Sequence, residues 1–435
     1  NAGAGDGMTL MSEDFTNARK SLQAIISSDF NTGWMHGDIK LATLSDTDTT
    51  TPASTNLVTN GTFASASNWT QIAGSSTAIT GGAMVFTNGG GYGGFYQSLG
   101  ALTAGKSYTL SFDVTSFTTA GAVFTLADTA FGVSFSGTGS YSFVTAPIVG
   151  SDPYIRLYAT AGGAFTIDNV SVVVAESDRS VNGKGLQVFG TVTKTAVATG
   201  AELVGYSGWS ASNYLAQPYN SDLDFGTGDF SYMGWVKWVS GTGYLFDRAD
   251  TSGNRRISVY PNSNGAVTFY TENGYQTSAA STLSANVWTH LTVVRRSGVI
   301  YGYHKGVQII TGFADTGSKT SADGSALLKA GVRFNNADAL NGSIALLRAS
   351  ATVPTAEQIV KIYNDEKHLF TTNAKATLYG TSDAVTALAY DDSTELLHVG
   401  TSAGRSEFQG LNRVNNTTDA VGTAISASNG FIVEE

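Results

Sequence analysis

The sequence predicts an all-β protein with two β-sandwiches in series, a short N-terminal helix and a small C-terminal β region. Only 13% of the 435 residues are charged and 51 are glycine, a composition typical of many short strands joined by turns. Several segments alternate apolar and polar residues, as expected of strands with one buried face. The chain is too long for one hydrophobic core, so we expect two to four domains.

The charge balance and the lack of cysteine restrict the function. The 24 basic and 34 acidic residues give a net charge of −10, which opposes attraction to nucleic acid or to an anionic membrane. Neutral sugars remain possible ligands. Because the sequence has no cysteine, stability must come from sheet packing, bound ions or association between chains. No apolar run approaches the ~20 residues of a membrane span, so we expect no membrane insertion.

Residues 1–50 are predicted to form an attachment segment with a helix. Ser12 can cap this helix, and its apolar residues recur at spacings of three and four. That stripe fits packing on the same chain or the seam of a helical trimer. The run DTDTTTPASTN, with no apolar period, follows and is interpreted as a linker. The apolar stripe consists of Phe15, Ala18, Leu22, Ile25 and Ile26.

Residues 56–176 read as one strand after another. In SYTLSFDVTSF, the residues Tyr108, Leu110, Phe112 and Val114 fall on one face and polar residues fall on the other. Strands at this spacing over about 120 residues predict a jelly roll or another sandwich.

The two ends of this segment resemble a known family. NLVTNGTFASASNWT and FTIDNVSVVV are similar to the first and last strands of jelly-roll carbohydrate-binding modules. The resemblance implies a structural calcium ion, with Asp168 as a ligand and the turn at Asn60 and Gly61 contributing backbone oxygens. Ala64 stands where that family usually has an acidic residue. The alternative is that Asp168 satisfies backbone donors at the end of a strand.

Residues 180–370 resemble the laminin-G-like branch of concanavalin A-type lectin folds across nearly their whole length. The motifs LDFGTGDFSYMGWVKW and VWTHLTVVRRSGVIYGYHKGVQI occur in the expected order. The resemblance implies that Trp288 anchors a strand in the core. Lys305 and Gly306 suit a turn that needs positive φ. A short helix should close the segment, since Thr355 and Gln358 have capping-box spacing.

Residues 375–435 are predicted to form a C-terminal β-hairpin region. DAVTALAYDDSTELLHVGTSAGRSEFQG reads as strands and turns and resembles part of one propeller blade. One blade cannot bury both faces alone, so it must pack on the sandwich or on copies of itself. We favour trimerisation.

The catalytic patterns of related folds are missing. Retaining glucanases on concanavalin-like folds carry Glu-x-Asp-x-x-Glu, which holds two carboxylates about 5 Å apart, and the sequence lacks this triplet. Asp365 and Glu366 are adjacent in YNDEKH, where we expect a solvated helix face. The five histidines show no metal-ligand spacing. The sequence therefore predicts a protein that is not an enzyme.

Sugar binding usually needs an aromatic ring with nearby polar groups. NGGGYGGFYQ places Tyr92, Phe95 and Tyr96 among glycines, which makes it the candidate glycan-binding loop. The alternative is that Phe95 and its neighbours fill the first core.

The second sandwich offers a different candidate site, a calcium-dependent one on a rim. The resemblance places an aspartate where the sequence has Ala345, which weakens that expectation. Asp247, Asp250 and Asn254 are candidate rim ligands or ordinary turn residues.

The order of segments resembles the tail-fibre and virion-surface proteins of marine bacteriophages. GWMHGDIKLATLSDTD, the two sandwiches and LAYDDSTELLHVGTSAGRS carry this resemblance. It implies an extracellular virion component, homotrimeric, that contacts other virion proteins and host cell-surface glycans. Multivalency would strengthen weak single sites. The alternatives are a structural capsid or tail adaptor that binds no sugar, a secreted bacterial adhesin, and the non-catalytic part of a polysaccharide-degrading enzyme.

Overall fold

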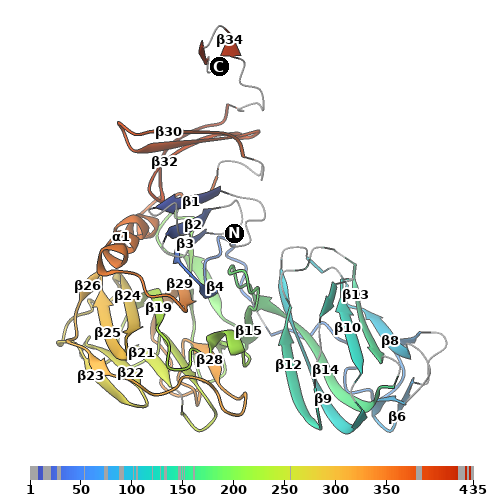
Figure 1. Ribbon diagram of the computed structural model, residues 1–435. Helices are drawn as coiled ribbons and strands as arrows, with labels where there is room; N and C mark the ends of the chain where they lie inside the picture. Colours follow the sequence, from blue (N-terminus) through green and yellow to red (C-terminus); the bar gives the residue numbers. More distant parts are fainter. Residues whose placement is uncertain are drawn as a thin grey trace.

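The computed structural model contains mostly antiparallel β structure, so the predicted all-β class is confirmed (Figure 1). No helix among the described residues has the length and hydropathy needed to cross a membrane. The structure describes residues 8–12, 21–26, 31–52, 54–72, 77–87, 93–100, 102–103, 106–119, 121–127, 129–131, 135–145, 148, 150, 152–159, 162–254, 256–378, 385–419, 427–428 and 431–432.

The first sandwich packs two sheets around an aromatic core. One sheet has the order β11-β10-β13-β8-β5, and the other contains β12-β9-β14 with β7 and β6 beside β14. The strands are β5 (Thr70–Gln71), β6 (Thr77–Thr80), β7 (Ala83–Phe86), β8 (Gly93–Ser98), β9 (Ser107–Thr119), β10 (Ala122–Leu126), β11 (Thr129–Phe131), β12 (Gly139–Val144), β13 (Tyr154–Ala159) and β14 (Ala164–Glu176).

Strand β9 shows why the sequence pattern succeeds here. Tyr108, Leu110, Phe112 and Val114 are all buried in this core, as the alternation predicts. The ring of Phe112 lies 5.2 Å from that of Phe124, edge to face, a favoured arrangement for aromatic pairs. Period-two burial is therefore confirmed from Leu110 to Val114, whereas Ser107 and Thr109 on the opposite face are also fully buried, contrary to the predicted polar face.

The second sandwich packs a sheet of order β16-β17-β29-β19-β24-β25-β26 against β15-β18-β28-β20-β21-β22-β23. The elements are β15 (Leu186–Phe189), β16 (Thr193–Ala196), β17 (Val204–Ser207), β18 (Tyr214–Gln217), η2 (Ser221–Leu223), β19 (Phe230–Trp238), β20 (Phe246–Ala249), β21 (Ile257–Pro261), β22 (Val267–Thr271), β23 (Gly274–Thr277), β24 (Trp288–Arg296), β25 (Val299–His304), β26 (Val307–Gln308), β27 (Phe313–Ala314), β28 (Leu327–Ala330) and β29 (Gly342–Ser350).

Two local predictions for this sandwich are confirmed. Lys305 and Gly306 have φ of 51° and 80° between β25 and β26. Helix α1 (Ala356–Glu366) is followed by η3 (Lys367–Phe370), and α1 begins with the predicted capping box. The Thr355 side chain accepts a hydrogen bond from Gln358 N at 3.2 Å, and the Gln358 side chain accepts one from Thr355 N at 2.9 Å. These turns need only nearby residues, which explains why the sequence predicts them.

The predicted N-terminal helix is wrong where the structure describes it. Residues 22–26 form β2, which pairs with β1 on one side and β3 on the other. Leu22 and Ala24 are buried and Gln23 between them is not, so the residues read as a helical stripe also satisfy a strand period. Pairing with the neighbouring strands favours the strand over the helix. Phe15 and Ala18, which belong to the same predicted stripe, lie outside the described residues. The strands are β1 (Met8–Ser12), β2 (Leu22–Ile26), β3 (Asn31–His36) and β4 (Ile39–Thr43).

The expectation of a solvated Glu366 is also wrong. Glu366 is fully buried and pairs with Arg348, whose Nη2 lies 2.9 Å from Glu366 Oε2. Trp235 Nε1 donates to the same oxygen at 2.7 Å, and Trp34 N donates to the other at 2.8 Å. The carboxylate thus joins the helix, the sandwich and the N-terminal strands.

The C-terminal sheet packs on its own chain. Val399, Phe408 and Leu411 share a buried cluster with Trp34 and Trp235. The same chain therefore covers part of one face, and trimerisation stays a prediction. Its strands are β30 (Val385–Asp391), β31 (Leu396–Thr401), β32 (Gly404–Gln409) and β33 (Asn412–Thr417), and a separate two-stranded sheet contains β34 (Ala427–Ser428) and β35 (Phe431–Ile432).

One sheet runs through both sandwiches. The end of β14 pairs with β15, with Ala175 opposite Gln187 and Glu176 opposite Leu186, so a 12-stranded sheet joins them (Figure 1). The predicted linker runs along this junction, where Ser54 N donates to Gly190 O at 2.9 Å. The sandwiches are therefore connected by backbone hydrogen bonds as well as by the chain.

A buried ionic network fastens the junction. Lys194 Nζ lies 2.6 Å from Asp46 Oδ2 and 3.7 Å from Glu176 Oε1, and Tyr206 Oη donates to Glu176 Oε2 at 2.6 Å. Asp46 comes from the linker, Glu176 from the end of β14 and Lys194 from β16. Breaking a buried ion pair is costly, so this network resists separation of the three segments.

Candidate functional site

A cleft of about 410 Å³ lies where the two sandwiches meet. Three separate segments line it: residues 142–144 of β12, the loop 182–185 before β15, and residues 217–221 after β18. Contacts between two modules are common places for small-molecule sites. Since both sandwiches supply walls, the cleft depends on the junction described above.

Lys184 is held firmly at this cleft. Its Nζ lies 2.7 Å from Asp222 Oδ2 and donates to Asn220 Oδ1 at 2.9 Å. Its backbone N donates to the buried carboxylate of Asp178 at 3.1 Å, and its carbonyl accepts from Gln217 Nε2. Lys184 is the one charged residue among the described lining residues, and Asp222 compensates its charge.

Two buried amides in the cleft wall have hydrogen-bonding capacity left over. Gln217 and Asn220 are 1% and 5% exposed. Gln217 Oε1 and Asn220 Nδ2 have no hydrogen-bond partner among the described residues. An unpaired buried polar atom costs ~1–3 kcal/mol. A hydroxyl group both donates and accepts, so an acceptor and a donor in one wall suit a ligand rich in hydroxyls.

Tyr219 contributes an aromatic ring that is 39% exposed. Its hydroxyl donates to Asp224 Oδ2 at 2.8 Å, and this hydrogen bond raises the pKa of the Tyr219 phenol. Phe143 of β12 lines the cleft as well. The arrangement can therefore offer apolar ring surface together with amide and ammonium groups.

Only part of the predicted glycan-binding loop, from Gly93 onward, lies among the described residues. Tyr92 lies outside the described residues. Phe95 is 5% exposed and belongs to the first core, so the alternative interpretation holds for this residue. Tyr96 is half-buried and packs edge to face on Tyr154, with centroids 5.5 Å apart. Phe95 is unsuitable for stacking on a sugar because both sheets cover it.

The predicted calcium ligands make local hydrogen bonds, Asn60 in a turn and Asp168 beside an irregularity in β14. Val170 N donates to Gly61 O at 2.9 Å, so the turn and the closing strand do lie together. The side chain of Asn60 donates to Ser65 O and Ser67 O at 2.8 and 2.9 Å. Asp168 Oδ1 accepts from Asn169 N at 2.7 Å.

These residues supply few of the oxygens that calcium requires. A Ca²⁺ ion takes six to eight oxygens, and within the described ranges no cluster of three or more Cys, His, Asp or Glu side chains is placed to hold a metal. The fit is therefore incomplete, and calcium binding stays a prediction.

The candidate rim ligands of the second sandwich have other roles. Asp247 is fully buried in β20 and pairs with Arg256, whose Nε lies 3.0 Å from Oδ1 and whose Nη2 lies 2.9 Å from Oδ2. Asp250 Oδ1 accepts from Asn254 N at 2.7 Å, as in an ordinary turn. Ala345 is fully buried.

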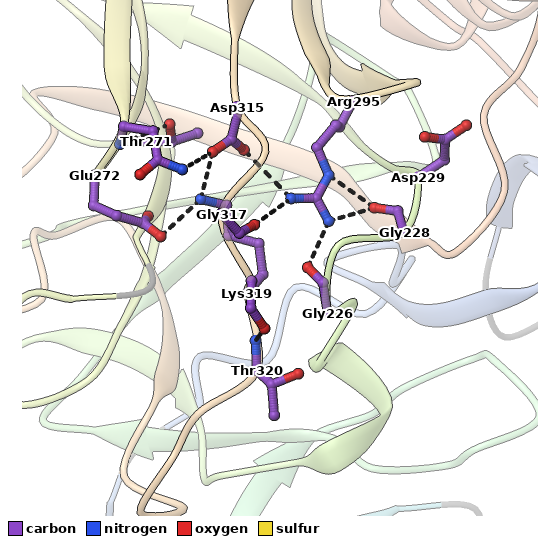
Figure 2. A network of polar contacts seen from close by, with 12 residues as sticks. Gly226, Gly228, Asp229, Thr271, Glu272, Arg295, Asp315, Gly317, Lys319 and Thr320 are labelled. Carbon is purple, nitrogen blue, oxygen red and sulfur yellow. Dashed lines mark hydrogen bonds and ion pairs between the residues drawn. The ribbon is translucent and has the colours of Figure 1, made fainter.

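Carboxylates near one end of the second sandwich are neutralised by cations (Figure 2). Lys319 Nζ lies 2.8 Å from both Asp315 Oδ1 and Glu272 Oε1. Arg295 Nη1 lies 3.5 Å from Asp315 Oδ2 and donates to Gly317 O at 2.9 Å. A glycosidase uses two carboxyl groups that flank the glycosidic bond, whereas these carboxylates are bound by Lys319 and Arg295. This network therefore suits a structural role.

Sequence reasoning misses the cleft residues. Lys184, Gln217 and Tyr219 belong to no motif, and the strand pairing of β14, β15 and β18 brings their segments together. The signal that points to the cleft is the pair of buried amides with unpartnered atoms, which only the structure reveals.

Comparisons with known proteins find one matching family model and several structures of low similarity. No curated protein is significantly similar in sequence to this chain. Domain 4 of the extracellular GH43 arabinanase AbnA from Geobacillus stearothermophilus, solved with arabinotriose, is 19% identical, with a TM-score of 0.34 over 43% of this chain and 92% of that one.

Two further structures extend the comparison. The receptor binding domain of botulinum neurotoxin C/D mosaic serotype is 10% identical, with a TM-score of 0.35 over 54% of this chain and 59% of that domain. The CBM40 of a Ruminococcus gnavus IT-sialidase is 12% identical, with a TM-score of 0.28 over 32% of this chain and 84% of that one. Residues 209–360 match the Laminin_G_3 model, described as the concanavalin A-like lectin/glucanases superfamily, so the second sandwich is a concanavalin A-like lectin/laminin G domain.

Proposed function

We propose that this protein binds glycans without transforming them, and that the cleft between the two sandwiches is a binding site. The observation that carries the proposal is the composition of the cleft wall: an exposed tyrosine ring beside two buried amides with unpartnered atoms. Sugars present both hydroxyl groups and apolar C–H faces, and neither contact alone competes well with water. The lectin-like domain that supplies most of the wall supports the same ligand class.

The proposed ligand is neutral. Lys184 is already paired with Asp222 at 2.7 Å, so an acidic sugar would have to compete with that carboxylate. The net charge of −10 also disfavours a polyanion. Gln217 Oε1 and Asn220 Nδ2 are themselves buried, so hydroxyls would pair with them only after the amides turn toward the cleft and give up their present hydrogen bonds to Lys184, while the Tyr219 ring stacks on one sugar face.

The absence of catalysis is part of the proposal. The sequence lacks the paired-carboxylate triplet, and Asp315, Glu272 and Glu366 are ion-paired with Lys319 or Arg348. Carboxylates held by a lysine or an arginine in this way are not free to flank a glycosidic bond as a catalytic pair.

The setting we propose is the surface of a bacteriophage virion, as a tail fibre or receptor-binding protein contacting host glycans and other virion proteins. A homotrimer would multiply weak contacts. The C-terminal sheet supports association because Leu388 and Tyr390 of β30 are 60% and 59% exposed. Sedimentation equilibrium tests the trimer, and electron microscopy of purified particles separates a virion protein from a secreted adhesin.

The proposed function is tested by glycan-array binding of the full chain. Tyr219→Ala should reduce binding of neutral glycans about tenfold, the scale of one aromatic contact, and leave the thermal midpoint nearly unchanged. Val307→Ala is the control, since it removes an exposed apolar side chain of β26 that lies outside the cleft lining and outside the C-terminal sheet. Equal binding by wild type and Tyr219→Ala would exclude the cleft.

The second candidate is a structural adaptor that binds no sugar. The continuous 12-stranded sheet favours it, because such a junction makes a stiff spacer. Wild-type protein that binds no glycan but is found in particles would support this candidate.

A structural calcium ion at Asp168 also remains proposed. A thermal midpoint that EDTA does not change would exclude this ion.

A further inference from the structure

A second aromatic surface lies at the far end of the shared sheet from the first sandwich. Tyr275 is 64% exposed on β23, which is the last strand in the order β15-β18-β28-β20-β21-β22-β23. Figure 1 shows β23 on the side of the second sandwich away from the first one. Six steps between strands separate β15 from β23, which corresponds to roughly 30 Å. This surface is therefore separate from the cleft.

The Tyr275 ring is supported from within the sheet. Tyr270 lies opposite it on β22, with ring centroids 6.2 Å apart and planes within 19°. The guanidinium carbon of Arg256 lies 4.6 Å from the Tyr270 centroid, and Arg256 is fixed in turn by the buried Asp247. An aromatic group that is already ordered loses little entropy when a ligand binds.

A row of polar groups runs beside the aromatic pair. Thr268 and Thr277 are opposite each other two residues along the same strands, so they share the face of Tyr270 and Tyr275. Their hydroxyls are 2.8 Å apart, and Asn262 Nδ2 donates to Thr268 Oγ1 at 2.9 Å. Thr277 is exposed. The face therefore offers a ring and hydroxyl groups within about one sugar residue of each other.

We propose that this face is a second carbohydrate-binding surface, on which Tyr275 stacks against one pyranose of a neutral polysaccharide and Thr277 binds its hydroxyls. The proposal rests on the proposed function for its ligand class only and does not require the cleft. A neutral ligand is indicated because Asp247 already balances Arg256. Two sites roughly 30 Å apart on one rigid sheet would engage a single polysaccharide chain several sugars long.

The test is retention of the full chain on amorphous cellulose, chitin, curdlan and agarose. The proteins compared are wild type, Tyr275→Ala, Tyr275→Phe, Tyr219→Ala and the control Val307→Ala, which changes an exposed side chain of β26. On a polysaccharide that retains wild type, Tyr275→Ala should weaken apparent affinity about tenfold. Tyr275→Phe keeps the ring, so it and the control should behave like wild type.

The outcomes distinguish this proposal from the proposed function. Loss of retention in Tyr219→Ala but not in Tyr275→Ala overturns the second surface and leaves the cleft standing. Loss in Tyr275→Ala alone supports the second surface and counts against the cleft. Equal loss in Val307→Ala would mean non-specific hydrophobic adsorption and would overturn the second surface. Failure of wild type to bind any of the four polysaccharides overturns both.

Discussion

The two sandwiches bury different kinds of side chain. Among the described residues from 56 to 175, no Asp, Glu, Lys or Arg is buried, and aromatic and aliphatic groups fill the core. The second sandwich buries Arg295 with Asp315 at one place and Arg348 with Glu366 at another. Apolar packing is tolerant of exchange, whereas an ion pair in a dry interior requires its partner. The second sandwich should therefore depend more on single residues.

The largest expected effect comes from Glu366→Ala. Removal of this carboxylate leaves Arg348 buried without its partner and removes acceptors from Trp34 N and Trp235 Nε1. The free energy of unfolding should fall by about 3–5 kcal/mol, as measured by urea denaturation. Glu357→Ala, an exposed site on the same helix, should cost less than about 1 kcal/mol. Equal losses in the two variants would contradict a special role for the buried pair.

Acid should weaken the second sandwich before the first. Burial lowers the pKa of His304, in β25 of the second sandwich, from 6.5 to about 4, and does the same for His36 in β3 of the N-terminal sheet, while residues 56–176 contain no histidine. These imidazoles stay neutral in the folded protein while the unfolded chain binds protons below pH 6.5. Their contribution is therefore complete above pH 6.5 and is lost as the pH falls from 6.5 to about 4.

Hydrogen exchange at pH 7 and pH 5 measures this difference. Protection should fall in β25 and β3 while that of β9 and β14 changes little. His304→Gln should reduce the pH dependence of β25. Equal loss of protection in β9 would show that the two sandwiches respond to acid as one unit.

A smaller effect is expected in the first core. Ile167 of β14 is fully buried and lies opposite Val114. Ile167→Val removes one methylene group and should lower the free energy of unfolding by about 0.5–1.5 kcal/mol. Thr115→Ser, on the exposed face of β9, is the control and should change it by no more than about 0.5 kcal/mol. A loss above about 3 kcal/mol for Ile167→Val would show that the first sandwich is as sensitive as the second.

The sequence predicts features that depend on nearby residues better than features that depend on tertiary packing. Strand β9 and the capping box at Thr355 are predictable because nearby residues determine them. The pair of Arg348 with Glu366 is not, because a charged residue at a helix end is usually solvated and only the packing of three segments buries this one. The prediction of a helix over residues 22–26 is wrong for a related reason. The spacing of Leu22 and Ala24 fits a strand as well as a helix, and pairing with β1 and β3 makes the segment a strand.

The two candidate binding sites differ in the same respect, since one is a single loop and the other is built from three separate segments. Sequence reasoning selects Tyr92, Phe95 and Tyr96 from one glycine-rich loop, and the structure places Phe95 in the core. The cleft draws Lys184, Gln217 and other residues from three segments, joined by the shared sheet. A binding surface made by tertiary contact leaves no local pattern, whereas aromatic residues in one loop do, even when their role is to pack.

The smallest expected effect concerns a second ion pair of helix α1, which is partly exposed, whereas the pair of Arg348 with Glu366 is buried. Lys361 Nζ lies 3.0 Å from Asp365 Oδ2 one turn before the buried Glu366, with side chains 38% and 19% exposed. Lysine on the N-terminal side is the weaker orientation for such a pair, and water screens it. Lys361→Met should therefore cost about 0.3–0.5 kcal/mol in low salt.

At 1 M NaCl that difference should vanish, because the Debye length falls to about 3 Å. The loss caused by Glu366→Ala should persist at the same salt concentration, because no solvent reaches that carboxylate. Urea denaturation of both variants at low and high salt measures this. A salt-independent loss in Lys361→Met would mean that its contact with the Trp34 ring, 5.6 Å from Nζ to the centroid, stabilises the helix more than the ion pair does.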